Sequence, residues 1–175
     1  TIFSIIFMGL NFLRMGTTGL AAQAAGAGEG DEVRAVLDSA AAVGKPIIVF
    51  SGGEPLMQKT FATDLLKACH KRGIHTAVDT SGAVSWNAFE AAAPHTDLFL
   101  YDIKHMDAAV HREATGASNR RILENLERLS GLGHEIALRF ALIPGFNDGD
   151  ENLHETGRYA AELPHRHPVS VLPFH

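Results

Sequence analysis

Short apolar runs that alternate with amphipathic segments constrain the fold of this 175-residue chain more than any other feature. The runs are rich in β-branched and aromatic residues, which predicts buried strands, and the segments between them repeat apolar residues at helical spacing. Because a strand–helix–strand unit crosses over with one hand, the alternation predicts a parallel sheet, either a partial barrel or an open doubly wound sheet. Strands are predicted at 2–8, 46–50, 74–79, 97–102, 135–143 and 169–173.

The predicted helices have polar capping residues at their starts and glycines near their ends. Residues 16–30 are rich in Gly, Ala and Thr and are expected to form a flexible loop, and no helix is predicted within 103–117. The five helices are predicted from Asp31 to Gly44, from Phe61 to Gly73, from Ser85 to Ala92, from Ser118 or Asn119 to Gly131 or Gly133, and from Asp150 to Leu163.

Composition narrows the setting of the protein. One domain over residues 1–175 is expected, since 46% hydrophobic residues suffice for a sizeable core. The formal charge of −5 includes no basic block, so nucleic acid is not expected as a partner. The run at 2–8 is too short to span a membrane, although a signal peptide cleaved near 21–24 is an alternative. The single cysteine, Cys69, excludes an internal disulfide, favours the reducing cytoplasm and is expected in the core.

A glycine-rich loop follows the predicted strand at 46–50. Residues 50–56 read Phe-Ser-Gly-Gly-Glu-Pro-Leu. Adjacent glycines can adopt positive φ and expose backbone N–H and C=O groups to a ligand, and the proline stiffens the end of the loop. Since parallel α/β folds bind ligands at the carboxyl ends of their strands, Gly52, Gly53 and Glu54 are candidate binding residues. An ordinary strand-to-helix turn is the alternative.

Polar residues also follow the other predicted strands, and parallel strands would bring them to one rim. Asp102 and Lys104 are two positions apart, so they point the same way from an extended backbone. An acid beside an ammonium suits a zwitterionic or nucleoside-bearing ligand, or else forms a plain ion pair. The further rim residues are predicted to be Asp79, Thr80, Ser81, His105, Arg139, Pro144, Asn147 and His175.

Three of these residues carry a specific chemical expectation. Arg139 lies within an apolar strand, where a buried guanidinium needs a partner such as Asp102 or Glu54, or a bound anion. Asp79 and Thr80 offer oxygens to a hard cation, or else cap a helix.

The ten histidines match no zinc-binding pattern, so no protein metal ligands are predicted. The glycine motifs that bind dinucleotides or the phosphates of nucleotides in P-loops are also not found in the sequence.

Six segments, in order over residues 46–175, form a recognisable pattern. They are Phe50–Leu56, His75–Gly82, Leu98–Met106, Thr115–Asn119, Ile143–Asp148 and Leu172–His175. Together they resemble the activating enzymes of glycyl-radical enzymes, the pyruvate formate-lyase activating enzyme-like proteins of the radical S-adenosylmethionine superfamily. The resemblance implies a partial (β/α)6 barrel of parallel strands, similar to a TIM barrel.

The same resemblance implies an activity: reductive cleavage of S-adenosylmethionine, after which the 5′-deoxyadenosyl radical takes hydrogen from a backbone glycine of a partner glycyl-radical enzyme. Flavodoxin or ferredoxin would donate the electron. By resemblance, Gly52, Gly53 and Glu54 bind the methionine end of the cofactor, and Asp102, Lys104 and His175 contact it. Asp79 and Thr80 match a monovalent cation site near the cofactor carboxylate. Arg139 matches an arginine of the cofactor and substrate pocket, and Lys104 and Arg139 are the implied catalytic residues.

One departure from the family concerns its [4Fe–4S] cluster. The family carries C-x-x-x-C-x-x-C after its first strand, whereas Leu10, Met15 and Thr18 stand at the matching positions here. None of these supplies a thiolate, and the chain has one cysteine where three are needed. Residues 1–30 are therefore interpreted as a degenerate or incomplete cluster-loop region, truncated or misread.

Three hypotheses follow from these residues. The first is an activating enzyme by descent. The second is a cluster-free barrel that binds S-adenosylmethionine without redox catalysis. The third is an unrelated aldolase-like barrel in which Lys104 is an amine nucleophile tuned by Asp102 and Arg139.

Overall fold

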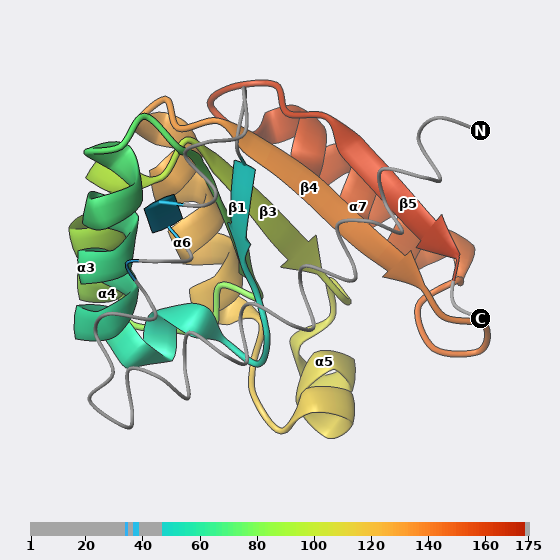
Figure 1. Cartoon of the computed structure of the whole chain (residues 1–175). Helices are drawn as coiled ribbons and strands as arrows, with labels where there is room; N and C mark the ends of the chain where they lie inside the picture. The colour runs from blue at the N-terminus through green and yellow to red at the C-terminus, as the bar shows by residue number, and fades with distance from the viewer. Residues whose placement is uncertain (1–33, 35–36, 39–46, 174–175) are drawn as a thin grey trace.

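The computed structural model describes residues 34, 37–38 and 47–173, which form a five-stranded parallel sheet with helices (Figure 1). The strands pair in the order in which they occur in the chain. The predictions for the strand at 2–8, the loop at 16–30, the cluster-loop positions Leu10, Met15 and Thr18, most of the first helix and His175 lie outside the described residues. The strands are β1 (Ile47–Phe50), β2 (His75–Thr80), β3 (Leu98–Ile103), β4 (Ile136–Leu142) and β5 (Val169–Pro173).

Helices α3, α4, α6 and α7 line one face of this sheet (Figure 1). Strands added one after another with helices on a single face give a barrel-type arrangement, whereas a doubly wound sheet reverses its strand order. No helix of the described residues has the length and apolar composition to cross a membrane. The helices are α3 (Lys59–His70), α4 (Trp86–Ala92), α5 (Ala108–Thr115), α6 (Arg120–Gly131) and α7 (Asp150–Glu162), with 3-10 turns η1 (Pro55–Gln58) and η2 (Ala93–His95).

Alternation along β3 explains why the helices cover one face. Phe99, Tyr101 and Ile103 are buried in the core that the helices share with the sheet. The ring of Phe89 on α4 lies 5.9 Å from Phe99 and 6.3 Å from Tyr101, centroid to centroid. The Tyr101 hydroxyl donates a hydrogen bond of 2.7 Å to the Ile122 carbonyl on α6, so its polar end is also satisfied.

Strand register places three charged residues on the opposite face of the sheet. Asp79 pairs in register with Leu100, and Asp102 pairs with Arg139. Because Leu100 and Asp102 are two positions apart on β3, all four side chains lie on the same face. The sheet therefore separates an apolar, helix-covered face from a face that carries charge.

Helix α5 was not predicted from the sequence. It begins at Asp107, whose carboxylate accepts hydrogen bonds from the Ala109 and Val110 amides at 2.7 and 2.9 Å. It ends at Gly116, which has a φ of +80°. His111 is its one buried residue, so the helix has no apolar stripe by which periodicity could reveal it.

The last helices follow the prediction in part, since one of the two residues proposed as the cap of α6 and most of the apolar residues of α7 do what was expected. Asn119 precedes α6, but its side chain makes no capping hydrogen bond, and the Ser118 hydroxyl accepts from the Arg120 amide at 3.3 Å instead. Of the four apolar residues expected on the last helix, Leu153 is exposed, whereas Tyr159 and Ala160 of α7 pack against the core and Leu163, just after the helix, is buried in it. Asn152 and Thr156 are also buried, so apolar packing and polar contacts together hold the inward side of α7.

Candidate functional site at the carboxyl edge of the sheet

Arg139 of β4 is the centre of an ion-pair network on the charged face. Its Nε donates to Asp102 Oδ1 at 2.8 Å, and its Nη2 lies 2.7 Å from the same oxygen. The Nη2 group also donates to Asp79 Oδ1 on β2. The Ser51 hydroxyl, directly after β1, donates to Asp79 Oδ2 at 2.8 Å. The prediction that Arg139 needs an acidic partner is confirmed for Asp102, and Asp79 takes the place proposed for Glu54.

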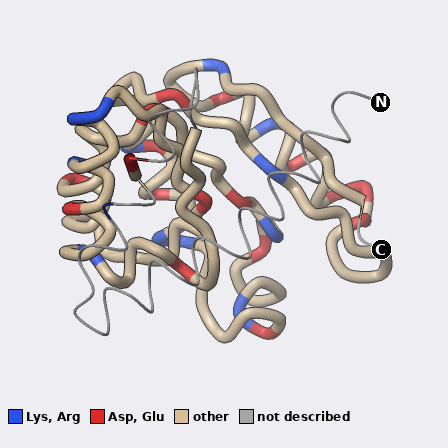
Figure 2. The backbone as a smooth tube through the Cα atoms, viewed as in Figure 1, with Lys and Arg blue, Asp and Glu red and all other residues tan. Residues whose placement is uncertain are grey.

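The network leaves an excess of negative charge. Although burial lowers the pKa of Arg139, the adjacent carboxylates of Asp102 and Asp79 raise it further, so the net pKa lies above the ordinary value and the guanidinium stays charged. Two carboxylates then share one guanidinium. Figure 2 shows that basic and acidic residues are interspersed over the described backbone. The negative charge at this site is therefore local and is not part of a larger acidic surface. The site therefore favours a ligand with a positive group.

The Gly-Gly-Glu loop is fastened to the end of β2 through Glu54. Thr80 Oγ1 donates to the Glu54 carboxylate at 2.9 Å, and the Ser81 amide and hydroxyl donate to it at 2.9 and 2.7 Å. Gly52 and Gly53 have φ values of +104° and +55°, and a Cβ built on either would meet nothing within 4 Å. The two glycines thus present open backbone beside the acidic residues, as a ligand-binding loop requires.

Lys104 follows β3 at the same edge of the sheet. Among the described residues it forms no ion pair with Asp102, because the Asp102 carboxylate binds Arg139 instead. The plain ion pair considered from the sequence is therefore not found there. The neighbouring His105 ring lies 5.5 Å from Phe146 in the loop after β4.

The structure brings most of the predicted rim together. Asp79, Asp102 and Arg139 come from three neighbouring strands and form one ion-pair network, and Glu54, in the loop after β1, binds Thr80 and Ser81 at the end of β2. Pro144 lies exposed in the loop after β4, whereas Asn147 is buried and binds backbone. His175 lies outside the described residues.

Ser51, Asn119 and Asn152 were missed as residues that support this edge. The register could have indicated Ser51, because Val49 pairs with Ala77, and two positions further on Ser51 faces Asp79. No local pattern marks the two asparagines, since their partners lie far away in the sequence.

The other candidates are structural. Cys69 is fully buried, and burial raises the pKa of its thiol to about 11, so it is an unreactive core residue, as predicted. His167 lies in a loop and forms a 2.8 Å hydrogen bond with Ser130 Oγ. In the part of the chain that the structure describes, no group of three or more His, Cys, Asp or Glu side chains is arranged to hold a metal ion.

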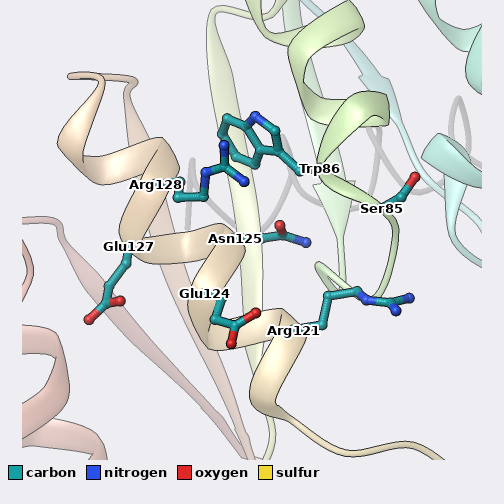
Figure 3. Close-up of a pocket in the computed structure, with 7 residues that line it drawn as sticks. All are labelled: Ser85, Trp86, Arg121, Glu124, Asn125, Glu127 and Arg128. Carbon is teal, nitrogen blue, oxygen red and sulfur yellow. The ribbon is translucent and has the colours of Figure 1, made fainter.

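A hollow lies between α4 and α6, on the helical side of the sheet (Figure 3). It has a volume of about 430 Å³. The Arg128 guanidinium lies 4.1 Å from the centre of the Trp86 ring, and buried Asn125 donates to the carbonyls of Gly82 and Val84 at 2.9 Å each. Its α6 wall carries two arginines and two glutamates, so its charge selects no ligand class. Its lining residues are Ser85, Trp86, Arg121, Glu124, Asn125, Glu127 and Arg128.

Two relatives show what this chain is similar to. It is 42% identical over 130 residues to the isethionate sulfite-lyase activating enzyme of Oleidesulfovibrio alaskensis, covering 73% of this chain and 41% of that protein. It is 41% identical over 133 residues to the 4-hydroxyphenylacetate decarboxylase activating enzyme of Clostridioides difficile, with the same coverage. The chain thus spans about two fifths of the length of these curated relatives.

A solved structure and a family model agree with these relatives. A domain of pyruvate-formate lyase-activating enzyme from Bacteroides vulgatus superposes with a TM-score of 0.68 at 35% identity, covering 73% of this chain and 80% of that one. The model of the Radical SAM superfamily matches residues 26–156, which include every strand from β1 to β4 and all the described acidic residues of the rim. This chain therefore belongs to the radical SAM superfamily.

Proposed function

We propose that this chain binds S-adenosylmethionine at the carboxyl edge of its sheet, as part of an activating enzyme for a glycyl-radical enzyme. The observation that carries this proposal is the ion-pair network of Asp79, Asp102 and Arg139 on three neighbouring strands, with the Gly-Gly-Glu loop bound to the end of β2 through Glu54. The cofactor has an ammonium and a sulfonium group, which suit the excess negative charge. The relatives, all named as activating enzymes, support the same choice.

Each rim residue has a proposed part in binding. The open backbone of Gly52 and Gly53, with Glu54, receives the methionine end. Asp102 accepts hydrogen bonds from ribose hydroxyls, Lys104 pairs with the carboxylate, and His175 contacts the cofactor. Asp79 and Thr80 supply oxygens near that carboxylate, and Lys104 and Arg139 act where cofactor and substrate meet. The assignment rests on the chemistry of these groups and on their position at one edge.

The partner and the setting are proposed on the same basis. The protein substrate is a glycyl-radical enzyme, from which a backbone glycine loses a hydrogen atom to the 5′-deoxyadenosyl radical. Flavodoxin or ferredoxin is the proposed electron donor, and the cytoplasm the proposed compartment. We further infer that residues 1–175 make up one radical-SAM-like partial barrel. Membership in this superfamily leaves the unrelated aldolase-like barrel without support.

The cysteines of this chain do not fit the [4Fe–4S] cluster that the superfamily implies. Iron–sulfur clusters are held by thiolates, and the chain has one cysteine. That residue, Cys69, is fully buried within α3, and burial raises its pKa to about 11, which disfavours the thiolate. A second candidate function is therefore a cluster-free protein that binds S-adenosylmethionine without redox chemistry.

Isothermal titration with S-adenosylmethionine tests the binding that both candidates share. We expect wild-type protein to bind and Asp102→Ala to bind at least ten-fold more weakly, because the substitution removes a carboxylate from the rim and leaves Arg139 with one acidic partner. Asp64→Asn, on the exposed side of α3, is the matched control and should bind like wild type. Absence of binding by wild type would contradict both candidates.

Analysis of iron and sulfide content after anaerobic reconstitution with iron and sulfide then distinguishes the activating enzyme from the cluster-free protein. Iron-free protein that still binds S-adenosylmethionine supports the cluster-free candidate. Stoichiometric iron and sulfide, with 5′-deoxyadenosine released from S-adenosylmethionine under reduction, supports the activating enzyme and would require ligands other than three cysteines of this chain.

A further inference from the structure

The backbone that leaves β3 is held by three buried asparagine side chains from distant parts of the chain. This segment, Lys104–Met106, follows directly after the strand that carries Asp102. A segment without regular structure still has to satisfy its N–H and C=O groups when they are buried. Here side-chain amides provide that satisfaction.

Asn147, in the loop after β4, makes the central contacts. Its Nδ2 donates to the Lys104 carbonyl at 2.9 Å and to the Ala141 carbonyl at 2.8 Å. Its Oδ1 accepts from the Ile143 amide at 2.7 Å. With 1% of its surface exposed, Asn147 uses both Nδ2 hydrogens and its oxygen to tie the end of β3 to the end of β4.

Asn152 and Asn119 hold the next two residues. Asn152, in the first turn of α7, accepts from the Met106 amide at 2.9 Å and donates to the Asn147 carbonyl at 2.9 Å. Asn119, at the start of α6, donates to the His105 carbonyl at 3.0 Å and also to the Met106 carbonyl. Both are buried, which explains why Asn119 does not cap α6 and why α7 turns a polar residue inward.

We propose that Asn119, Asn147 and Asn152 are positioning residues that fix the direction in which Lys104 leaves the backbone. This inference rests on the proposed function, since it assigns Lys104 to the carboxylate of S-adenosylmethionine. The hydrogen bonds to the carbonyls of residues 104–106 and to the Met106 amide restrict the backbone dihedral angles of this segment. These angles determine the direction of the Cα–Cβ bond of Lys104. An amide suits this task because it donates and accepts at once, whereas a carboxylate cannot donate.

A double-mutant cycle on S-adenosylmethionine binding tests the proposal. Asn147→Ala should weaken binding roughly ten-fold in the wild-type background. In the Lys104→Ala background the same substitution should change the dissociation constant less than about two-fold, because its effect passes through the lysine. Equal losses in both backgrounds, or no loss in folded Asn147→Ala, would overturn the proposal.

Ser130→Ala is the matched control for a buried polar substitution. Ser130 is fully buried near the end of α6, where its hydroxyl oxygen accepts from the His165 amide at 3.1 Å, away from the carboxyl edge. The Ser130→Ala substitution should lower the urea midpoint of unfolding without changing the dissociation constant for S-adenosylmethionine. If Asn147→Ala does not fold, Asn152→Ala replaces it, with the same predicted dependence on Lys104.

Amide hydrogen exchange tests the role of the asparagines independently of S-adenosylmethionine binding. If wild-type protein does not bind S-adenosylmethionine, the proposed function fails, but the Met106 amide still reports on the asparagines. Asn152→Ala should increase its exchange at least ten-fold, and Ser130→Ala should not. Unchanged exchange in Asn152→Ala would show that the asparagines do not hold this segment.

Discussion

At the scale of the residue, Arg139 is the side chain on which the charged face depends. Its guanidinium is the shared partner of Asp79 and Asp102, which come from two different strands. A guanidinium between two carboxylates replaces their mutual repulsion with two attractive ion pairs. Because the Asp79 and Arg139 side chains are only 10% and 19% exposed, solvent screens these ion pairs little.

Replacement of Arg139 by alanine should therefore destabilise the protein by about 3 kcal/mol, because it leaves two partly buried carboxylates facing each other. Urea unfolding at pH 7 measures the change. Arg120→Ala is the control, since Arg120 forms an exposed ion pair with Glu124 on α6 and should cost less than about 0.5 kcal/mol. A loss for Arg139→Ala no larger than the control would mean that the network contributes nothing to stability.

At the scale of the element, α5 differs from the other helices in what stabilises it. Because His111 is its one buried residue, α5 gains little stability from packing. The capping interactions at its two ends therefore stabilise it more than packing does. Asp107 supplies two hydrogen bonds at the first turn, and these bonds hold the pKa of its carboxyl below the ordinary value.

Asp107→Ala should therefore fray α5 while the rest of the fold stays intact. The amides of Ala109 and Val110 lose their acceptor, so hydrogen exchange at these two positions should rise several-fold. Exchange at Leu126 on α6 and the urea midpoint should stay close to wild type. Protection of Ala109 and Val110 that survives the substitution would contradict this account of α5.

The same elements show what could be predicted from sequence. The five strands that the structure describes were located to within one or two residues because β-branched runs are short and bounded, and their polar ends predicted the shared edge. Helix α5 was missed because capping, not periodicity, defines it. On α7 the buried Asn152 was missed because its side chain accepts from the backbone amide of Met106, 46 residues away, and no local pattern indicates such a contact.

At the scale of the whole molecule, several histidines couple stability to pH. Burial lowers the pKa of His134, and burial with the nearby His165 lowers that of His167. For His95, burial is the largest cause, followed by the positive charges of Lys67, His70 and Lys71. All three pKa values lie below the ordinary 6.5, so the folded state disfavours the charged rings.

The sign of the resulting pH dependence follows by linkage. The unfolded chain binds protons at these histidines near pH 6.5, before the folded state does, so their contribution is complete above that pH and is lost as the pH falls through the lowered pKa values. The urea midpoint should be lower at pH 5.0 than at pH 7.5. His134→Gln should narrow this difference, and an equal midpoint at the two pH values would contradict the assignment.

The sequential order of the sheet has a consequence for synthesis. Each strand pairs with the strands immediately before and after it in the chain, so a growing polypeptide can add one strand and one helix at a time as it leaves the ribosome. The contacts at the carboxyl edge join residues that are far apart in the chain, since Asp79 pairs with Arg139, and the Met106 amide binds Asn152. The nascent protein would thus acquire its sheet progressively, and the contacts of Asp79 and Met106 only after β4 and the first turn of α7 have been synthesised.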